Sequence, residues 1–323
     1  MTRVVSVAQT LNDQAFEALL AEAADAGDTR LLFDARHVRF ADPYGMTGLL
    51  ALGTYIGETG GRPMLQLPQS PDVQRYFAGI GFTAAAQTVF EMGETVRGRA
   101  AGEGSVLLPI TVIGSHEDVH GVVDQLNEGR VSALLADQLG YSKADAIAFS
   151  MLLSEVSQNI IEHADAPGWV GIQVYNWARR LGRKVAVIAV MDLGIGFKGS
   201  LEREHAARFG DRWGDATALE AAFIHGVTRF RDPGRGQGLK QIRKKVGRWG
   251  GKIAIRSGTA RIADVPEWDD SVPMETGLPY FPGAQIEIIL PAREPAPLPQ
   301  APAGRPGTRA AAPSAPPRRP PPG

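Results

Sequence analysis

Three polar residues recur at helical spacing near the middle of the chain. Glu155, Asn159 and His163 lie four residues apart within 146–164, where the apolar residues also recur at helical spacing. We expect one long amphipathic helix that carries the three on a single stripe. A carboxylate beside a carboxamide can hold a hydrated divalent ion and a water molecule. From spacing alone, a solvated helix face is the simpler interpretation.

A second candidate site follows an apolar run. Residues 185–191 predict a buried strand, and Asp192, Gly194 and Gly196 come directly after it. A carboxylate held at the end of such a strand can accept a hydrogen bond from an exocyclic amine, while glycines let a planar ring approach the backbone. A plain turn between strand and loop remains an alternative, because Asp and Gly are common turn residues.

A third segment is rich in glycine. Gly234, Gly236 and Gly238 alternate with other residues before Leu239, and 238–246 predicts a helix. Free backbone N–H groups at a helix start can bind phosphate. The segment is not a P-loop, because no Gly-Lys-Ser/Thr ends it. It is also not a dinucleotide fingerprint, because no strand directly precedes it.

In order and spacing, the segments SEVSQNIIEHAD, MDLGIGF and GRGQGLKQI resemble the N box and the two glycine boxes of the GHKL ATPase superfamily. The resemblance covers residues 106–291 and implies an α/β sandwich of mixed sheet and helices, the Bergerat fold. It includes the expected strands over 253–262 and 285–291. The form Asn-x-x-Glu-His is especially similar to the anti-sigma-factor kinases.

The resemblance also implies roles for the motif residues. Glu155 would be the general base that polarises the attacking water or hydroxyl. Asn159 would bind a Mg²⁺ that bridges the phosphates of ATP, and Asp192 would bind the adenine amine. The other implied nucleotide-site residues are His163, Gly194, Gly196, Gly234, Arg235, Gly236, Gly238 and Leu239. The family threonine before the last strand is replaced here by Ala284, which should weaken nucleotide binding by about 1 kcal/mol.

Residues 198–233 would form the mobile lid over the phosphates. This segment is rich in charge and includes Arg229 and Arg231, with Arg235 directly after it. One of these arginines could neutralise the γ-phosphate during transfer, whereas a solvated surface position is the simpler role for any one of them.

The N-terminal part of the chain alternates expected strands and helices. Residues 30–36 and 62–67 predict strands, 46–60 predicts a helix closed by glycine, and a short helix should begin after Pro71. The order indicates a small α/β layer domain. Over residues 4–91 the chain resembles a STAS domain, the fold of anti-sigma-factor antagonists.

One turn departs from that family. The STAS turn usually presents a serine that accepts a phosphoryl group at a helix start, and Tyr44, preceded by Pro43, stands at that place here. A rigid ring puts the hydroxyl several ångströms further out, so we expect this domain to dock a partner without phosphorylation at the turn.

The remaining features bound the class of protein. The absence of cysteine excludes disulfides, thiolate metal sites and cysteine nucleophiles. A net charge of -1 gives no field for nucleic acid or an anionic membrane. The absence of a long apolar run and of a signal-peptide pattern favours a cytoplasmic protein.

Composition shifts divide the chain into four parts. We expect a STAS-like domain over 1–95, a linker over 96–106, a GHKL domain over 107–291 and a disordered Pro/Ala/Arg-rich tail over 292–323. The tail is either a solubilising extension or an arm for an aromatic groove.

Two functions remain open. One is an ATP-dependent protein serine/threonine kinase of the anti-sigma type, with ATP and Mg²⁺ bound and a sigma factor or STAS-type antagonist as its protein partner. The other is an ATP-gated binding module with slow or no turnover, which the missing acceptor at Tyr44 favours. Neither binds nucleic acid or membrane directly, and a homodimer is possible for both.

Overall fold

The computed structural model describes residues 2–25, 29–93, 106–115, 130–164, 166–228 and 238–293, together with Asp118, His120, Gly121, Val122 and Asp124. The chain is a mixed α/β protein with one parallel and one antiparallel main sheet. We call residues 2–93 the N-terminal unit and residues 106–293 the C-terminal unit. The expected tail beyond Arg293 and most of the expected linker lie outside the described residues.

The N-terminal unit is built on a parallel sheet with strand order β1-β3-β5-β6. Its strands are β1 (Thr2–Ser6), β3 (Arg30–Asp34), β5 (Met64–Gln66) and β6 (Glu91–Met92), and a separate parallel pair is formed by β2 (Thr10–Leu11) and β4 (Phe40–Ala41). The helices are α1 (Asp13–Ala24), α2 (Pro43–Gly60), α3 (Pro71–Gly79) and α4 (Phe82–Val89). Parallel neighbours require crossover connections, which these helices supply.

Local signals set the helix starts of this unit. The side chain of Asn12 accepts a hydrogen bond from the backbone N–H of Ala15 at 3.1 Å, and Asp42 does the same for Gly45 at 2.8 Å. Both are N-cap positions, and Pro43 suits the first turn of α2 because that turn needs no N–H donor. The helix expected over 46–60 therefore starts three residues earlier.

The C-terminal unit is built on an antiparallel sheet with strand order β10-β11-β9-β8-β7. The strands are β7 (Val106–Ile113), β8 (Gly168–Trp177), β9 (Arg183–Asp192), β10 (Lys252–Asp264) and β11 (Met274–Pro291). The helices are α6 (Arg130–Leu139), α7 (Lys143–Ala164), α8 (Gly196–Phe209), α9 (Asp215–Phe223) and α10 (Gly238–Arg248), with the short 3₁₀ helix η1 (Gly210–Arg212).

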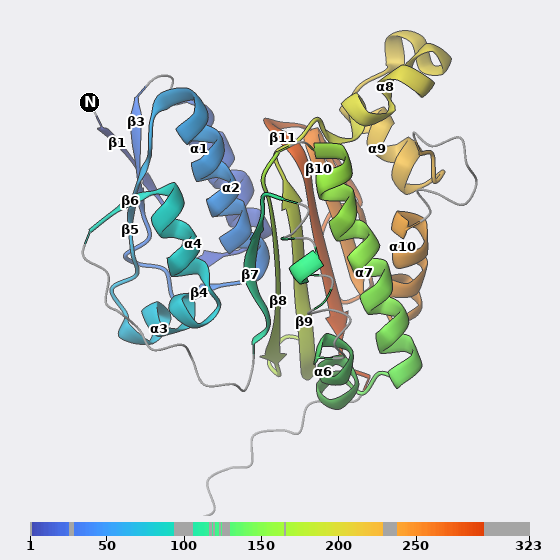
Figure 1. Ribbon diagram of the computed structural model, residues 1–323, viewed down its shortest axis with the longest axis horizontal. Coiled ribbons are helices and arrows are strands. Elements are labelled where there is room, and N and C mark those ends of the chain that lie inside the picture. The colour runs from blue at the N-terminus through green and yellow to red at the C-terminus, as the bar shows by residue number, and fades with distance from the viewer. Residues whose placement is uncertain are drawn as a thin grey trace, which may run out of the picture.

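Each face of this sheet is covered by different helices. Helices α6, α7 and α10 pack on one face, where Phe149, Leu153 and Ile242 enter one buried core with the strands. On the other face lie α1 and α2 of the N-terminal unit (Figure 1). The molecule is therefore a stack of four layers: sheet, helices, sheet and helices. Apolar residues of α2, from Tyr44 to Leu52, share one core with Trp169, Met191 and Phe281 of the C-terminal sheet.

Aromatic contacts form the apolar part of the interface between the units. Phe281 of β11 packs edge-on against Phe16 and Tyr55, with ring centroids 5.5 and 5.7 Å away. At the other side of the interface, the hydroxyls of Tyr76 and Tyr175 lie 2.5 Å apart, and both contact the carbonyl of Ala41. The two units thus meet through close contacts at both ends of the interface.

Charged residues form the polar part of the same interface. Arg256 of β10 is fully buried and donates to Glu17 of α1 at 2.6 Å. Arg261 donates to Asp13 at 3.1 Å. Buried cations are costly unless they are paired, so these contacts fix α1 against β10.

Lys252 of β10 is a third buried cation at this interface, and three carboxylates surround it. Its buried ammonium lies 3.5 Å from Asp13, 3.4 Å from Asp269 and 3.4 Å from Glu287. Burial alone would lower the pKa of Lys252, but the three carboxylates raise it. Asp13 also pairs with Arg261, and Asp269 with Arg180. Burial, followed by the charge of Asp13, nevertheless raises the pKa of Glu287 to about 7.

The turn at Tyr44, where the family carries its phosphoacceptor serine, lies inside the molecule. Tyr44 is 3% exposed, and its ring packs edge-on against Phe16 at 5.9 Å. Burial also raises the pKa of the Tyr44 hydroxyl. The chain's own second sheet covers this turn, so a phosphoryl group on Tyr44 would require the two units to separate.

The segment expected to form the lid is largely helical, and its role over a nucleotide stays a prediction. Most of 198–233 folds as α8, η1 and α9, and only its end lies outside the described residues. Asp215 accepts hydrogen bonds from the backbone and the side chain of Thr259 on β10, at 2.9 and 2.8 Å. Leu219 and Phe223 are buried in the core with residues of the sheet, so α9 packs against the sheet.

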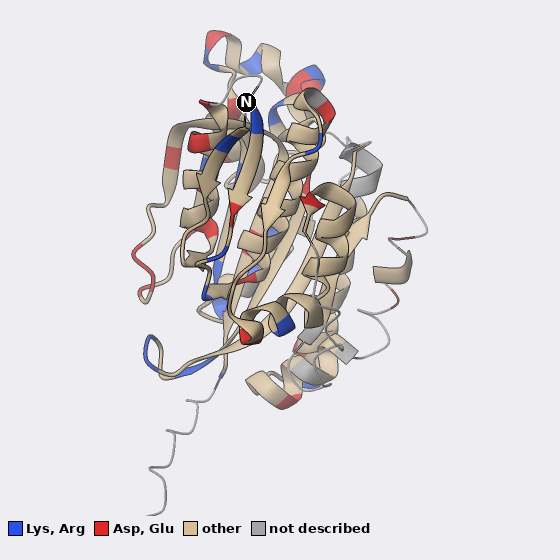
Figure 2. Ribbon diagram, turned by 90° about the vertical axis from the view of Figure 1, so that its left-hand side faces the viewer, with Lys and Arg blue, Asp and Glu red and all other residues tan. Residues whose placement is uncertain are grey.

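Two further observations concern the outside of the molecule. Lys and Arg are interspersed with Asp and Glu along the ribbon when it is viewed from the N-terminal unit (Figure 2). Within the described residues, no helix is both long and apolar enough to cross a membrane.

The buried carboxyl of Glu287 makes stability depend on pH. Because the folded pKa of about 7 exceeds the ordinary value of 4.5, ionisation opposes folding, and the free energy of unfolding should fall as pH rises from 5 to 7.5. In Glu287→Gln, the decrease in the free energy of unfolding over this pH range should be smaller than in the wild type by about 2 kcal/mol. Chemical denaturation at a series of pH values measures it.

Glu275→Gln is the matched control, because Glu275 pairs with a β10 cation, Arg261, as Glu287 does with Lys252, but its side chain is 38% exposed. Its pH profile should follow that of the wild type. An unchanged slope in Glu287→Gln would show that this carboxyl is not the group that titrates.

Candidate functional site

Helix α7 carries the first candidate motif. Ser142 accepts a hydrogen bond from the backbone N–H of Asp145 at 3.1 Å and so caps the helix start. The helix runs through positions 155, 159 and 163, one turn apart, as expected. Glu155 is half-buried, while the side chains of Asn159 and His163 lie outside the described residues.

The carboxylate of Glu155 lies against the start of α10. A Cβ atom placed on Gly238 would be 2.7 Å from the carboxyl carbon of Glu155, too close for a real contact. The positive end of a helix dipole favours an anion at this place. The structure thus brings together the first and third motifs of the sequence.

Only part of the third motif is described. Gly238 is the first residue of α10, and Leu239 packs against the core of the C-terminal unit. Gly234, Arg235 and Gly236 lie outside the described residues. Their expected contact with phosphate therefore stays a prediction.

Asp192 ends strand β9, as the sequence predicts. Its Oδ1 accepts a hydrogen bond from the backbone N–H of Gly194 at 2.8 Å. Burial raises the pKa of Asp192 to about 6, although backbone hydrogen bonds from Gly194 and Ala284 act in the opposite direction. The half-buried carboxyl group is therefore an acceptor that ionises less readily than an exposed aspartate.

The turn before the last part of β11 lies directly against this residue. Gly283 has a φ of 74°, and a Cβ atom on it would be only 2.0 Å from the backbone oxygen of Asp192. Glycine is required here both by the left-handed backbone and by the close approach. The last-strand turn and the first glycine motif are thus neighbours.

Ser257 joins these segments, and sequence reasoning missed it. Its hydroxyl donates to the carbonyl of Gly283 at 2.7 Å and accepts from the backbone N–H of Phe197 at 3.1 Å. A Cβ atom on Gly196 would be 2.5 Å from the same hydroxyl. A sequence signal that could have indicated it is Gly258, because a glycine inside a strand pattern is typical of a β-bulge. The register of β10 does shift at this position.

Asp192 lies near the C-terminal end of α7, and Glu155 lies further back along the same helix. Asp192 pairs with Gly168, and Leu193 donates to the carbonyl of Pro167, just beyond the end of α7. Glu155 is nine residues before Ala164, the last residue of α7, or about 13 Å along the helix axis. A ligand that contacts both groups must therefore be elongated.

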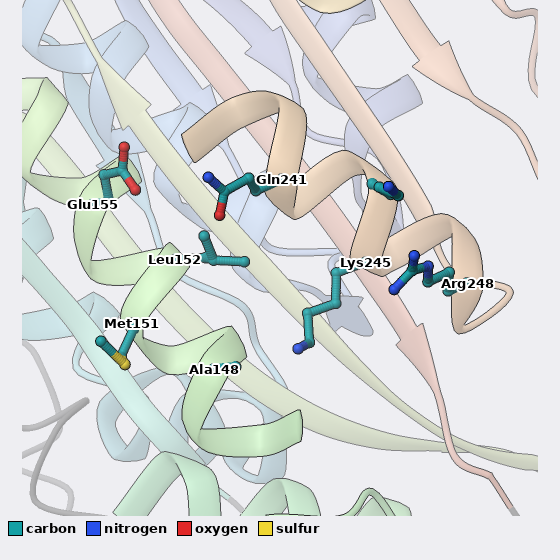
Figure 3. A pocket seen from close by; sticks show the side chains of 8 residues that line it. Ala148, Met151, Leu152, Glu155, Gln241, Lys245 and Arg248 are labelled. Atoms are coloured by element: carbon teal, nitrogen blue, oxygen red, sulfur yellow. The ribbon is translucent and has the colours of Figure 1, made fainter. Parts of the chain in front are cut away.

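Glu155 also lines a groove between α7 and α10, with a volume of about 510 Å³ (Figure 3). The residues that α10 contributes are Gln241, Lys244, Lys245 and Arg248, and those from α7 are Ala148, Met151, Leu152 and Glu155. Cationic side chains predominate on the α10 side.

No preformed metal cluster is found among the described side chains, where no three His, Asp or Glu residues come together in a suitable way. The expected Mg²⁺ ligand, Asn159, is outside that set. The magnesium site therefore stays a prediction.

No protein-family model matches the chain, and no curated protein matches it either. The geometry above is thus the basis for any functional proposal.

Gly283 offers a test of the contact with Asp192. Gly283→Ala should lower the free energy of unfolding by about 1–3 kcal/mol more than Gly277→Ala does, because its Cβ overlaps the Asp192 carbonyl. Gly277 is the matched control: it lies in the same strand with a φ of 73° and has open space around it. Denaturant unfolding measures both, and equal losses would mean that the overlap is relieved without cost.

Proposed function

We propose that the C-terminal unit is an ATP-binding domain of the GHKL type and that the protein is an ATP-dependent protein serine/threonine kinase of the anti-sigma-factor type. In this proposal the N-terminal unit is a STAS-like domain, and the protein acts in partner-switching signalling. The observation that carries it is that motif segments far apart in the sequence are neighbours in two pairs: Glu155 lies against Gly238, and Asp192 lies against Gly283.

The residues of these two pairs suit an elongated anionic ligand with a planar head. The start of α10 favours an anion, and in the described state the carboxylate of Glu155 lies there. At the other end, Asp192 is an acceptor for an amine, beside glycines that leave the backbone open to a ring.

Each residue has a distinct part in this proposal. Bound Mg·ATP would supply the phosphoryl group. Glu155 would accept the proton of the attacking hydroxyl, Asn159 would bind the Mg²⁺, and Asp192 would orient the base. Gly194 and Gly196 would let the ring of the base approach the backbone. The residues proposed to line the phosphates and the lid are His163, Gly234, Arg235, Gly236, Gly238 and Leu239.

One observation favours a second candidate, the ATP-gated binding module with slow or no turnover. Tyr44, at the place of the family's acceptor serine, is buried against the chain's own sheet. An acceptor hydroxyl must therefore come from another molecule, such as a sigma factor or a separate STAS-type antagonist. Without such an acceptor, nucleotide binding alone would carry the function.

Asn159→Ala tests nucleotide binding. Loss of the proposed Mg²⁺ ligand should weaken Mg·ATP binding at least about tenfold, or about 1.4 kcal/mol, in isothermal titration calorimetry. Gln158→Ala, which changes an exposed neighbour on the same helix, should bind like the wild type. Normal affinity in Asn159→Ala would refute the site.

Glu155→Gln separates the kinase from the binding module. If Glu155 is the general base, transfer of labelled γ-phosphate to sigma factors or STAS-type antagonists should fall about 100-fold or more. The affinity for ATP should change little. Wild-type protein that binds ATP and alters its affinity for a partner, but transfers no phosphate, would favour the module instead.

A further inference from the structure

The groove between α7 and α10 extends away from the site described above. Its lining runs from Glu155 back to Ala148, seven residues or about 10 Å along α7. The side chains of Gln241 and Lys245 extend from α10 toward α7 across this groove (Figure 3). Neither the general base nor the expected nucleotide contacts account for its far part.

The two walls of the groove differ in chemistry. On the α7 side, Met151 is 64% exposed, and Ile147, one turn earlier on the helix, is 52% exposed. Leu152 is partly buried at the floor and packs against the core. Neighbouring exposed apolar side chains of this size are typical of a surface that another chain covers.

The α10 wall is cationic. Helix α10 buries Ile242 and Val246 and contains no acidic residue. Lys245 lies 3.3 Å from Asp145 and is thus partly neutralised. Lys244 and Arg248 are exposed, and within the described part of the chain neither has an acidic partner.

We propose that this groove is the docking site for an acidic amphipathic segment of a partner protein. The apolar face of such a segment would cover Met151 and Leu152, and its carboxylates would pair with Lys244, Lys245 and Arg248. One end of the groove is Glu155, so the docked segment leads into the proposed transfer site. In this respect the inference deepens the proposed function and rests on it.

The chain's own C-terminal tail is a poor occupant. Residues 294–323 contain four arginines and a single acidic residue, Glu294. Like charge would oppose its binding beside Lys244 and Arg248. A nucleic acid would suit the cationic wall but would leave the apolar wall uncovered.

The test uses the full-length protein and a fluorescein-labelled 14-residue peptide with leucines at helical spacing and glutamates elsewhere. A peptide in which every Glu is replaced by Lys is the matched probe. Fluorescence anisotropy should show that the protein binds the acidic peptide and not the Lys-substituted one. The affinity for the acidic peptide should weaken as NaCl rises from 50 to 500 mM. In methyl NMR of labelled methionines, the Met151 signal should shift on binding, assigned with Met151→Leu.

Charge reversal locates the site. Lys244→Glu with Arg248→Glu should weaken peptide binding at least tenfold, whereas Arg39→Glu with Arg179→Glu, exposed residues far from the groove in sequence, should have little effect for the same change in net charge. Equal binding of both peptides, an unmoved Met151 signal, or equal losses in the two double variants would overturn the inference. So would a dimer, detected by sedimentation, that the groove variant dissociates, or tighter binding of a 20-nucleotide single-stranded DNA there.

A separate titration with Mg·ATP distinguishes this inference from the proposed function. Acidic-peptide binding at the groove in a protein that fails to bind ATP would support the docking site and refute the nucleotide site. Normal ATP binding without peptide binding would refute the docking site and leave the proposed function standing.

Discussion

The buried ammonium of Lys252 holds the two halves of the molecule in register. It lies among carboxylates from α1, β11 and the loop after β10, and it is reinforced by the pairs Arg256 with Glu17 and Arg261 with Asp13. Because a buried charge tolerates little displacement from its partners, this group fixes which face of the antiparallel sheet the N-terminal unit covers. The opposite face is then the one available to α7 and α10.

The candidate site depends on that assignment of faces. With α1 and α2 on one side, the candidate residues lie on the middle of α7 beside the start of α10 and at the end of β9. Ser257 links this region to the sheet, because its hydroxyl contacts both the backbone beside Gly196 and the turn at Gly283. Contacts from β10 and β11 thus hold the backbone around Asp192 in place. The basic outer face of α10 is exposed to other molecules.

Local patterns in the sequence predicted the elements that carry the motifs. The periodicity around Glu155 predicted α7, the apolar run before Asp192 predicted β9, and the glycine segment predicted the start of α10. The pairing of Lys252 with Asp13 could not be predicted, because it joins residues 239 positions apart through tertiary structure alone. Helices α8 and α9 were not predicted: the charge of α8 is typical of a solvated loop, and α9 is anchored through hydrogen bonds from Thr259 to Asp215, 44 positions apart in the sequence.

The way in which α1 and α2 cover the sheet limits how the protein can be dissected. Composition places a boundary near residue 100, but a fragment that starts at β7 would leave Arg256 without Glu17 and would expose Trp169, Met191 and Phe281 to water. The stability and ligand binding of such a fragment would reflect the loss of α1 and α2 as much as the properties of the site. For recombinant work, the smallest faithful fragment is therefore the pair of units together.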